Sequence, residues 1–294
     1  MFMQLFGSYL LNNGIITGGQ LNQALMKKGQ ISVKLGVLAI NAGYMTAAQV
    51  EQVHQRQAQV DKRMGDIATE MGFLSAAQVE ELLGAQSPAH LRLGQALVDL
   101  GFVTNAQFEK ALSDYKRQYL LSDTDFANED VQKANAIISA FLCFSGVEHY
   151  EYCVDYISLL FKSITRFITD DFVPLEPTCV KGTKCALMVR QKINGIFSAH
   201  TGFECTPDTL LAFASRYAGE EITEQGEFAD SVVGEFMNLH NGLFAVNASV
   251  ARDVELSLEP QYMDKAVSLT KGTYCILLPI SFTFGVVKFV LFPQ

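Results

Sequence analysis

The sequence predicts an all-α helical repeat array followed by an α+β domain with a mostly antiparallel sheet and flanking helices. Three observations lead to this prediction: a pattern that recurs every 29 residues near the N-terminus, mixed helix and strand signals after about residue 120, and a hydrophobic content of 49% over 294 residues. That content is enough for two hydrophobic cores. We therefore expect a repeat domain over residues 1–119, a helical linker over 120–146 and a second domain over 147–294.

Each repeat contains two glycines seven residues apart, then a hydroxyl residue and, three residues after it, a glutamine. The glycine pairs are Gly7/Gly14, Gly36/Gly43, Gly65/Gly72 and Gly94/Gly101, and the hydroxyl–glutamine pairs are Thr17/Gln20, Thr46/Gln49, Ser75/Gln78 and Thr104/Gln107. Ser or Thr with Gln at the third helical position forms a capping box, in which each side chain binds an unpaired N–H at the helix start. The pattern therefore predicts four helices that begin at these caps.

Apolar residues flank every cap, which predicts a hydrophobic staple on each of the four helices. They are Ile16, Met45, Leu74 and Val103 before the caps, and Leu21, Val50, Val79 and Phe108 after the glutamines. A period near 30 residues is typical of stacked two-helix units that cannot bury their apolar faces alone. Residues 1–11 are then the first helix of the first unit.

Beyond the repeats, helix and strand signals are mixed. An amphipathic helix is expected over 151–169, after a helical segment that breaks near Ser145–Gly146. A cap, a proline and an acid at Thr206-Pro207-Asp208 predict a helix start, and Gly219 predicts its end. The remaining expectations are a hairpin of strands 185–190 and 193–202 around Lys192–Asn194, a helix over 227–244, and strands over 252–259, 273–279 and 282–291. This order predicts an α+β domain.

Charge and cysteine content narrow the class of partner. Residues 126–294 hold 12 Lys and Arg against 20 Asp and Glu, which disfavours nucleic acid or anionic lipid as a partner of this half. The six cysteines show neither a C-x-x-C pair nor zinc spacing, so we expect free thiols, no metal site and a cytoplasmic protein.

The apolar segment 273–292 contains Pro279 and many β-branched residues, so strands joined near 279–281 are favoured over a membrane-spanning helix.

Three polar residues mark one face of the predicted 227–244 helix. Ser231, Glu235 and Asn238 follow one another at i, i+4 and i+7, within an arc of about 60°. An apolar stripe lies opposite, formed by Val233, Phe236, Met237, His240 and Phe244. The polar face is either a solvated surface or a site. Ser and Asn are mediocre helix formers, which makes them unusual choices for a purely structural surface.

This pattern resembles the signature of the chemotaxis phosphatase family of CheC, CheX and FliY, an Asp/Ser-x3-Glu-x2-Asn motif followed by a proline. Here the signature residues are Ser231, Glu235 and Asn238, with Gly234, Gly242 and Pro260 as supporting positions. The resemblance covers about residues 147–294 and contains one signature copy, as in CheX. It departs at His240, Asn241 and the Leu243-Phe244 pair, where the family usually shows other residues.

The resemblance implies hydrolysis of the aspartyl phosphate of a CheY-like response regulator. The receiver would bring its own Mg²⁺ and lysine, so no cofactor of this chain is expected. Asn238 would hold the attacking water, Glu235 would pair with the receiver's lysine, and Ser231 would only flank them. CheX-like domains commonly pair through their sheets, so a homodimer is expected. The alternative is a signalling adaptor that docks a receiver without hydrolysis.

The repeats resemble the cyclic di-GMP-binding N-terminal domain of MshE-type secretion ATPases, whose 24-residue motifs recur with a five-residue spacer. The matching positions are Arg63, Gly65, Gly72 and Gln86 in the third unit, Lys34, Gly36, Gly43 and Gln57 in the second, and Arg92 and Gly94 in the fourth. Arginine suits such a ligand because its plane stacks on guanine and its fork pairs with phosphate. The alternative is a structural or docking module in which the glycines end helices and the arginines are solvated.

Overall fold

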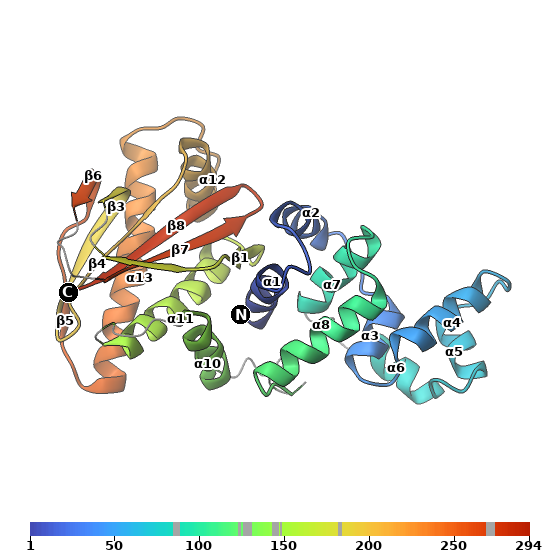
Figure 1. Cartoon of the computed structure of the whole chain (residues 1–294). Helices are drawn as coiled ribbons and strands as arrows, with labels where there is room; N and C mark the ends of the chain where they lie inside the picture. The colour runs from blue at the N-terminus through green and yellow to red at the C-terminus, as the bar shows by residue number, and fades with distance from the viewer. Residues whose placement is uncertain are drawn as a thin grey trace. The chain divides into compact units, whose positions relative to one another are not determined.

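The computed structural model describes residues 1–84, 89–122, 125, 131–142, 147, 149–181, 184–268 and 274–294. Residues 2–133 form one unit and residues 134–294 another (Figure 1). The segment expected as a linker, 120–146, is divided between the two units, and Ser145–Gly146, where we expected a break, lies outside the described residues.

The described part of the first unit is helical. Its helices are α1 (Phe2–Asn12), α2 (Gly18–Lys28), α3 (Leu35–Asn41), α4 (Ala47–Gln57), α5 (Met64–Glu70), α6 (Ala76–Gly84), α7 (Ala89–Asp99) and α8 (Asn105–Gln118). Thr17, Thr46 and Thr104 each form the predicted capping box. Ser75 does the same with Gln78, since the backbone N of each residue binds the side-chain oxygen of the other at 2.8 and 3.2 Å. The predicted helix starts are therefore confirmed.

The glycine that ends the first helix of each pair has left-handed backbone geometry. Gly14, Gly43, Gly72 and Gly101 have φ between 65° and 72°. A side chain is strained in this region, so glycine recurs here for a local structural reason.

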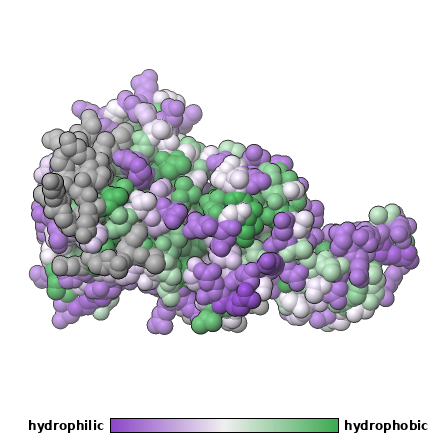
Figure 2. Space-filling model, viewed as in Figure 1, coloured by the Kyte–Doolittle hydropathy of each residue, from purple (hydrophilic) through white to green (hydrophobic). Residues whose placement is uncertain are grey.

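The helix pairs do not contact one another simply in chain order. Helix α1 contacts α7 and α8, and α2 contacts α7, so the first pair lies against the fourth. The second pair contacts both the third, through α3 and α6, and the fourth, through α4 and α8. Polar contacts cross the interface between the second and fourth pairs, among them the bond from the backbone N of Ala47 to Glu109 at 2.8 Å and the bond from Lys116 to Asn41 at 3.3 Å. Hydrophilic residues gather over α4 and α5, at the right of Figure 2.

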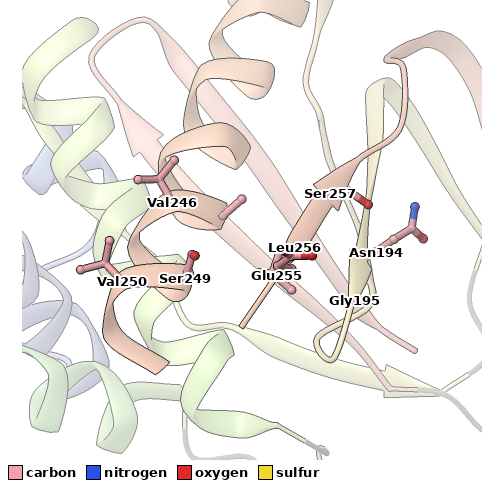
Figure 3. Close-up of a pocket in the computed structure, with 9 residues that line it drawn as sticks. Asn194, Gly195, Val246, Ser249, Val250, Glu255, Leu256 and Ser257 are labelled. Atoms are coloured by element: carbon pink, nitrogen blue, oxygen red, sulfur yellow. The ribbon is translucent and has the colours of Figure 1, made fainter. Parts of the chain in front are cut away.

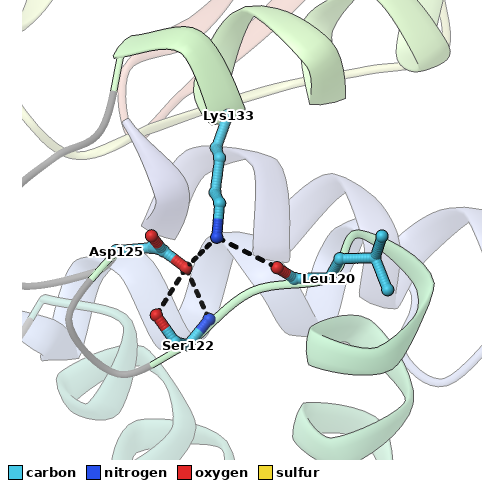
Figure 4. Close-up of polar contacts among 4 residues, drawn as sticks. All are labelled: Leu120, Ser122, Asp125 and Lys133. Carbon is cyan, nitrogen blue, oxygen red and sulfur yellow. Dashed lines mark hydrogen bonds and ion pairs between the residues drawn. The ribbon is translucent and has the colours of Figure 1, made fainter.

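The C-terminal end of the first unit is held by one buried carboxylate (Figure 4). Asp125 accepts hydrogen bonds from the backbone N and the hydroxyl of Ser122, both at 2.6 Å, and forms an ion pair with Lys133. Lys133 also donates to the carbonyl of Leu120 at 3.1 Å. These contacts lower the pKa of Asp125 to about 2, with the Lys133 hydrogen bond as the largest cause and the Ser122 bonds next.

The second unit combines helices with an antiparallel sheet. Its elements are α10 (Val131–Leu142, from residue 134), α11 (Tyr150–Phe167), β1 (Phe172–Pro174), β2 (Thr178–Lys181), β3 (Lys184–Gly195), β4 (Ala199–Glu204), α12 (Pro207–Ala218), α13 (Glu227–Arg252), β5 (Leu256–Leu258), β6 (Tyr262–Ser268), β7 (Tyr274–Phe282) and β8 (Gly285–Pro293). The strand order is β1-β7-β8-β4-β3-β5, with β2 beside β7 and β6 beside β3, and the pairs are antiparallel. The predicted α+β class of this half is confirmed.

Several predicted boundaries were wrong. The hairpin does not turn at Lys192–Asn194, because β3 continues to Gly195 and Ile193 pairs with Ala199. The last two strands do not meet near Pro279–Ser281 either, because Pro279 lies inside β7 and the turn follows Phe282, which pairs with Gly285. The predicted helix 227–244 is α13 and continues to Arg252, and the predicted strand 252–259 is reduced to β5.

Helices α11, α12 and α13 cover one face of the sheet (Figure 1). Phe213 of α12 is the centre of this core, with ring contacts to Phe203 of β4, Phe236 of α13 and Phe282 of β7. The predicted start of α12 is confirmed, since Thr206 caps it and Gly219 ends it with φ of 74°. Among the described residues, no helix is both long enough and apolar enough to cross a membrane.

Candidate functional site

Helix α13 carries the predicted site residues on one face and the core on the other. Ser231 and Glu235 are exposed and Asn238 is half-buried. The predicted apolar stripe is confirmed, because each of its members is at most 2% exposed: Val233, Phe236, Met237, His240 and Phe244. The stripe fixes the rotation of the helix, and with it the direction in which the polar face points.

Asn238 is held by a glutamine from the neighbouring sheet. Gln191 of β3 donates from Nε2 to Asn238 Oδ1 at 2.9 Å, and from the same nitrogen to the carbonyl of Glu259 at 3.0 Å. Glu259 immediately precedes Pro260, which is exposed. The structure therefore brings together Asn238 and the segment that carries the signature proline, through a residue outside the signature.

Sequence reasoning missed Gln191, although a signal for it exists. Val189, Gln191 and Ile193 alternate along β3, and all three are buried on the side that faces the helices, with Gln191 only 1% exposed. A polar residue at an inward position of a strand must find partners, because an unpaired buried amide is costly. Our placement of the hairpin turn at 192–194 divided this strand and hid the alternation.

Two residues that depart from the family pattern, His240 and Asn241, are fully buried. Asn241 Nδ2 donates to Gln191 Oε1 and to Thr201 Oγ1, both at 2.8 Å, and its Oδ1 accepts from the hydroxyl of Tyr156 at 2.8 Å. His240 Nδ1 lies 3.3 Å from the hydroxyl of Ser163. Burial lowers the pKa of His240 to about 3. These departures therefore belong to the interior and leave the exposed face of α13 unchanged.

Glu235 is a free carboxylate at the surface. Within the described part of the chain it has no ion pair or hydrogen-bond partner. The pKa of the neighbouring Tyr217 is raised, first by burial and then by the negative charge of Glu235. Ser231 lies one turn before Glu235 and is likewise exposed, so the two form an open surface together with half-buried Asn238.

The glycines of the signature differ in their surroundings. Gly234 is buried in α13, whereas Gly242 is half-buried, and a Cβ built on Gly242 would meet no atom within 4 Å. Gly242 is therefore not required for steric reasons, and the helix passes through it.

A separate groove of about 540 Å³ lies toward the C-terminal end of α13 (Figure 3). Residues from α13, β3 and the β5 segment line it: Asn194, Gly195, Ala245, Val246, Ser249, Val250, Glu255, Leu256 and Ser257. It contains none of the signature residues. Among the described residues, no group of three or more His, Cys, Asp or Glu side chains is placed to hold a metal ion.

The residues predicted to bind a nucleotide lie at helix starts and helix contacts of the first unit. Lys34 and Arg63 are the residues before α3 and α5, and both are exposed. Lys34 is engaged within the protein, since its Nζ lies 2.7 Å from Asp99 Oδ1 and its backbone N donates to Gln95 at 3.0 Å. The cavity beside it is about 50 Å³, far below the roughly 300–1,000 Å³ of typical ligand pockets.

The other predicted nucleotide-binding residues do not converge on one cavity. Gln57 donates to the carbonyl of Lys62 at 3.0 Å. Arg92 lies inside α7, and its Nε is buried without a hydrogen-bond partner among the described residues. Gln86 lies outside the described residues. The glycines at these positions are Gly36, Gly43, Gly65, Gly72 and Gly94, and they lie at helix ends or helix contacts.

No protein-family model matches this chain, and none of the curated proteins matches it. Among solved structures, it is similar to a CheC-like superfamily protein from a Shewanella species, with 14% identity over 49% of this chain and 97% of that chain and a TM-score of 0.42. CheX from Desulfovibrio desulfuricans gives 14% identity over 49% and 99%, with a TM-score of 0.42. The CheX–CheY–BeF₃–Mg²⁺ complex from Borrelia burgdorferi gives 15% over 49% and 97%, with a TM-score of 0.39. These three structures correspond to about half of this chain, and the middle domain of FliM from Vibrio alginolyticus is also similar, with 10% identity over 48% of this chain and 89% of that chain and a TM-score of 0.35.

Proposed function

We propose that the second unit hydrolyses the aspartyl phosphate of a CheY-like response regulator, and that the first unit is a regulatory or docking module. Dimerisation through the second unit is part of the same proposal. One observation carries it: Asn238 is held by Gln191 through its oxygen, one turn from the exposed and unpaired carboxylate of Glu235. The Ser231-x3-Glu235-x2-Asn238 signature supports the same assignment.

The residue types suit this chemistry. Phosphoryl transfer needs little covalent participation and depends on positioning and on stabilisation of charge. An asparagine amide both donates and accepts, so it can hold a water in line with the phosphorus. Asn238 Oδ1 uses one acceptor position for Gln191, and its Nδ2 has no partner among the described residues, so both a donor and a second lone pair are available.

Glu235 has a different role in the proposal. A receiver supplies its own Mg²⁺ and a lysine beside the phosphorylated aspartate, so this chain needs no cofactor for the reaction. The exposed Glu235 carboxylate would pair with that lysine and set the register of the complex. Asn238, one helical turn away, then lies beside the phosphoryl group.

The test is the lifetime of phosphorylated receivers. Response regulators from the same genome are phosphorylated with radiolabelled phosphodonor, and the loss of label is followed with and without the protein. The proposal expects faster loss for at least one receiver, and little acceleration with Asn238→Ala. A receiver that binds in its phosphorylated form but keeps its lifetime would replace the enzyme with an adaptor.

A further inference from the structure

Gln191 occupies the junction between the two distant parts of the signature. Both hydrogens of its Nε2 are engaged, one by Asn238 and the other by the carbonyl of Glu259, while its Oε1 accepts from Asn241. The side chain is 1% exposed. A buried amide with this many satisfied bonds is held in one orientation.

Two backbone carbonyls, which can only accept, fix the orientation of the whole chain of amides. The Thr201 hydroxyl donates its proton to the carbonyl of Gln191 at 3.2 Å, so it must accept from Asn241 Nδ2, which also donates to Gln191 Oε1, while the Tyr156 hydroxyl donates to Asn241 Oδ1. The carbonyl of Glu259 likewise requires the Nε2 end of Gln191 on its side. Gln191 Nε2 then faces Asn238 as a donor, so Asn238 must accept with its Oδ1.

The signature proline contributes to the same arrangement. The proline ring clashes with a helical conformation of the residue before it, so that residue favours extended geometry. Glu259 is held in this way and also donates from its backbone N to the carbonyl of Lys192 at 2.9 Å. Its own carbonyl is thereby kept in place as the second acceptor for Gln191.

We propose that Gln191 is the positioning residue for Asn238: it fixes the Asn238 amide with Oδ1 inward and Nδ2 outward, and it ties that amide to the segment before Pro260. This inference rests on the proposed phosphatase function for its catalytic consequence. An apolar side chain at residue 191 would fill an inward strand position without the cost of burying an amide. Besides satisfying the buried amide of Asn241, the glutamine places a donor toward Asn238, which an apolar residue could not do.

The decisive variants are Gln191→Glu and Gln191→Leu. A buried glutamate carboxylate only accepts, so Asn238 would turn its Nδ2 inward and present the wrong atom to the water. We expect receiver dephosphorylation by Gln191→Glu to fall at least tenfold at pH 7.5, with affinity for the phosphorylated receiver within threefold of wild type. Burial raises a carboxyl pKa, and the protonated acid donates again, so the ratio of variant to wild-type rate should rise as pH falls toward 5.5.

Gln191→Leu is the matched control for that pH profile. It removes the donor without adding a titratable group, so its rate should also fall at least tenfold but keep a constant ratio to wild type across the pH range. A merely structural role for Gln191 does not produce the difference between the two profiles. Wild-type turnover by both variants would overturn the inference while leaving the phosphatase proposal intact.

A second measurement is independent of activity. In NMR spectra of the isotope-labelled wild-type protein, the side-chain NH₂ protons of Gln191 and Asn241 should exchange slowly with water, and those of Asn238 rapidly. Slow exchange at Asn238 would mean that its Nδ2 points inward, and would overturn the inference. This comparison decides the orientation even where a variant fails to fold or no receiver is dephosphorylated, and that last result would count against the proposed function alone.

Discussion

Gly94 of α7 lies directly against the ring of Phe108 of α8, so that a Cβ at residue 94 would be 2.2 Å from a ring carbon. The same contact recurs in the two preceding repeats, where a Cβ on Gly36 or Gly65 would lie 2.9 Å from Val50 or Val79. The recurring glycine therefore lets the two helices of a pair approach closely. This packing role explains Gly36, Gly65 and Gly94, which are among the positions predicted to bind a nucleotide, without any ligand.

Gly94→Ala should destabilise the first unit. The overlap with Phe108 costs about 1–3 kcal/mol by overpacking, more than the roughly 1 kcal/mol by which alanine is the better helix former. Thermal unfolding followed by circular dichroism should show a lower midpoint. Gly19→Ala in α2 is the control. A Cβ at residue 19 would meet no atom within 4 Å, so this change should leave the unfolding midpoint unchanged or raise it. Equal midpoints for the two variants would contradict the packing explanation.

The first unit was predictable where its signals are local. A capping box such as that of Thr46 and Gln49 is set by three residues, and it forms where the sequence places it. Which helix pairs meet was not predictable. The contacts of the first pair with the fourth depend on side chains far apart in the chain, such as the ring pair of Phe6 and Tyr115.

In the second unit, the buried and exposed faces of α13 could be predicted from the sequence, but the hydrogen-bond partner of Asn238 could not. The apolar stripe follows from helical periodicity, which is a property of one segment. The bond between Gln191 and Asn238 joins residues 47 positions apart and requires the register of β3 against the helix. Helix ends were also hard to predict, because Gly242 is tolerated inside α13 and the C-cap is Asp253 with φ of 53°.

His240 should make the second unit sensitive to acid. Burial lowers its pKa to about 3 from the ordinary histidine value of 6.5. Between pH 6.5 and pH 3 the histidine is protonated in the unfolded chain but neutral in the folded protein. The free energy of unfolding therefore decreases as pH falls through this range, by up to about 1.4 kcal/mol per pH unit. Urea denaturation at pH 7.5, 5.5 and 4.5 measures this slope. For His240→Phe, the free energy of unfolding should depend less steeply on pH over the same range. Equal slopes for the variant and the wild-type protein would show that His240 is not responsible.

Asp125 should titrate abnormally because of Lys133. Its pKa is lowered to about 2 from the ordinary aspartate value of 3.8, so its contribution to stability is present above pH 3.8 and is lost as pH falls through 2. NMR titration of the carboxyl carbon should show the low value directly. Lys133→Met should return the pKa toward 3.8, whereas Ser122→Ala should return it by less. An unperturbed Asp125 in the wild-type protein would contradict the ion pair of Figure 4.

Binding of cyclic di-GMP to the first unit remains a prediction with a direct test. Arg63 is exposed at the start of α5, whereas Lys34 already pairs with Asp99, so Arg63 is the better candidate for a ligand contact. If the nucleotide binds, Arg63→Ala should weaken binding at least tenfold, which corresponds to about 1.4 kcal/mol. Lys62→Ala removes an equal charge from the neighbouring position and should have a smaller effect. Calorimetry without heat at high micromolar nucleotide would leave the repeats as a scaffold.

Substitutions at Glu235 and Asn238 should affect receiver binding and receiver turnover differently. Asn238→Ala removes the group proposed to hold the water and should lower turnover of a phosphorylated receiver by on the order of 10²-fold, with affinity largely unchanged. Glu235→Gln removes a charged contact with the partner and should weaken affinity as well as turnover, with a loss that shrinks at high salt. Single-turnover decay of labelled receiver over a range of protein concentrations separates the two effects.

Ser231→Ala is the matched control, because Ser231 is exposed on the same face of α13 and has no proposed role in the reaction. Neither site variant should unfold the protein, since Glu235 is exposed and Gln191 keeps its bond to Glu259 when Asn238 is shortened. If Asn238→Ala weakened affinity while the bound receiver kept its wild-type decay, Asn238 would be a docking residue. The water-positioning role would then have to be given up.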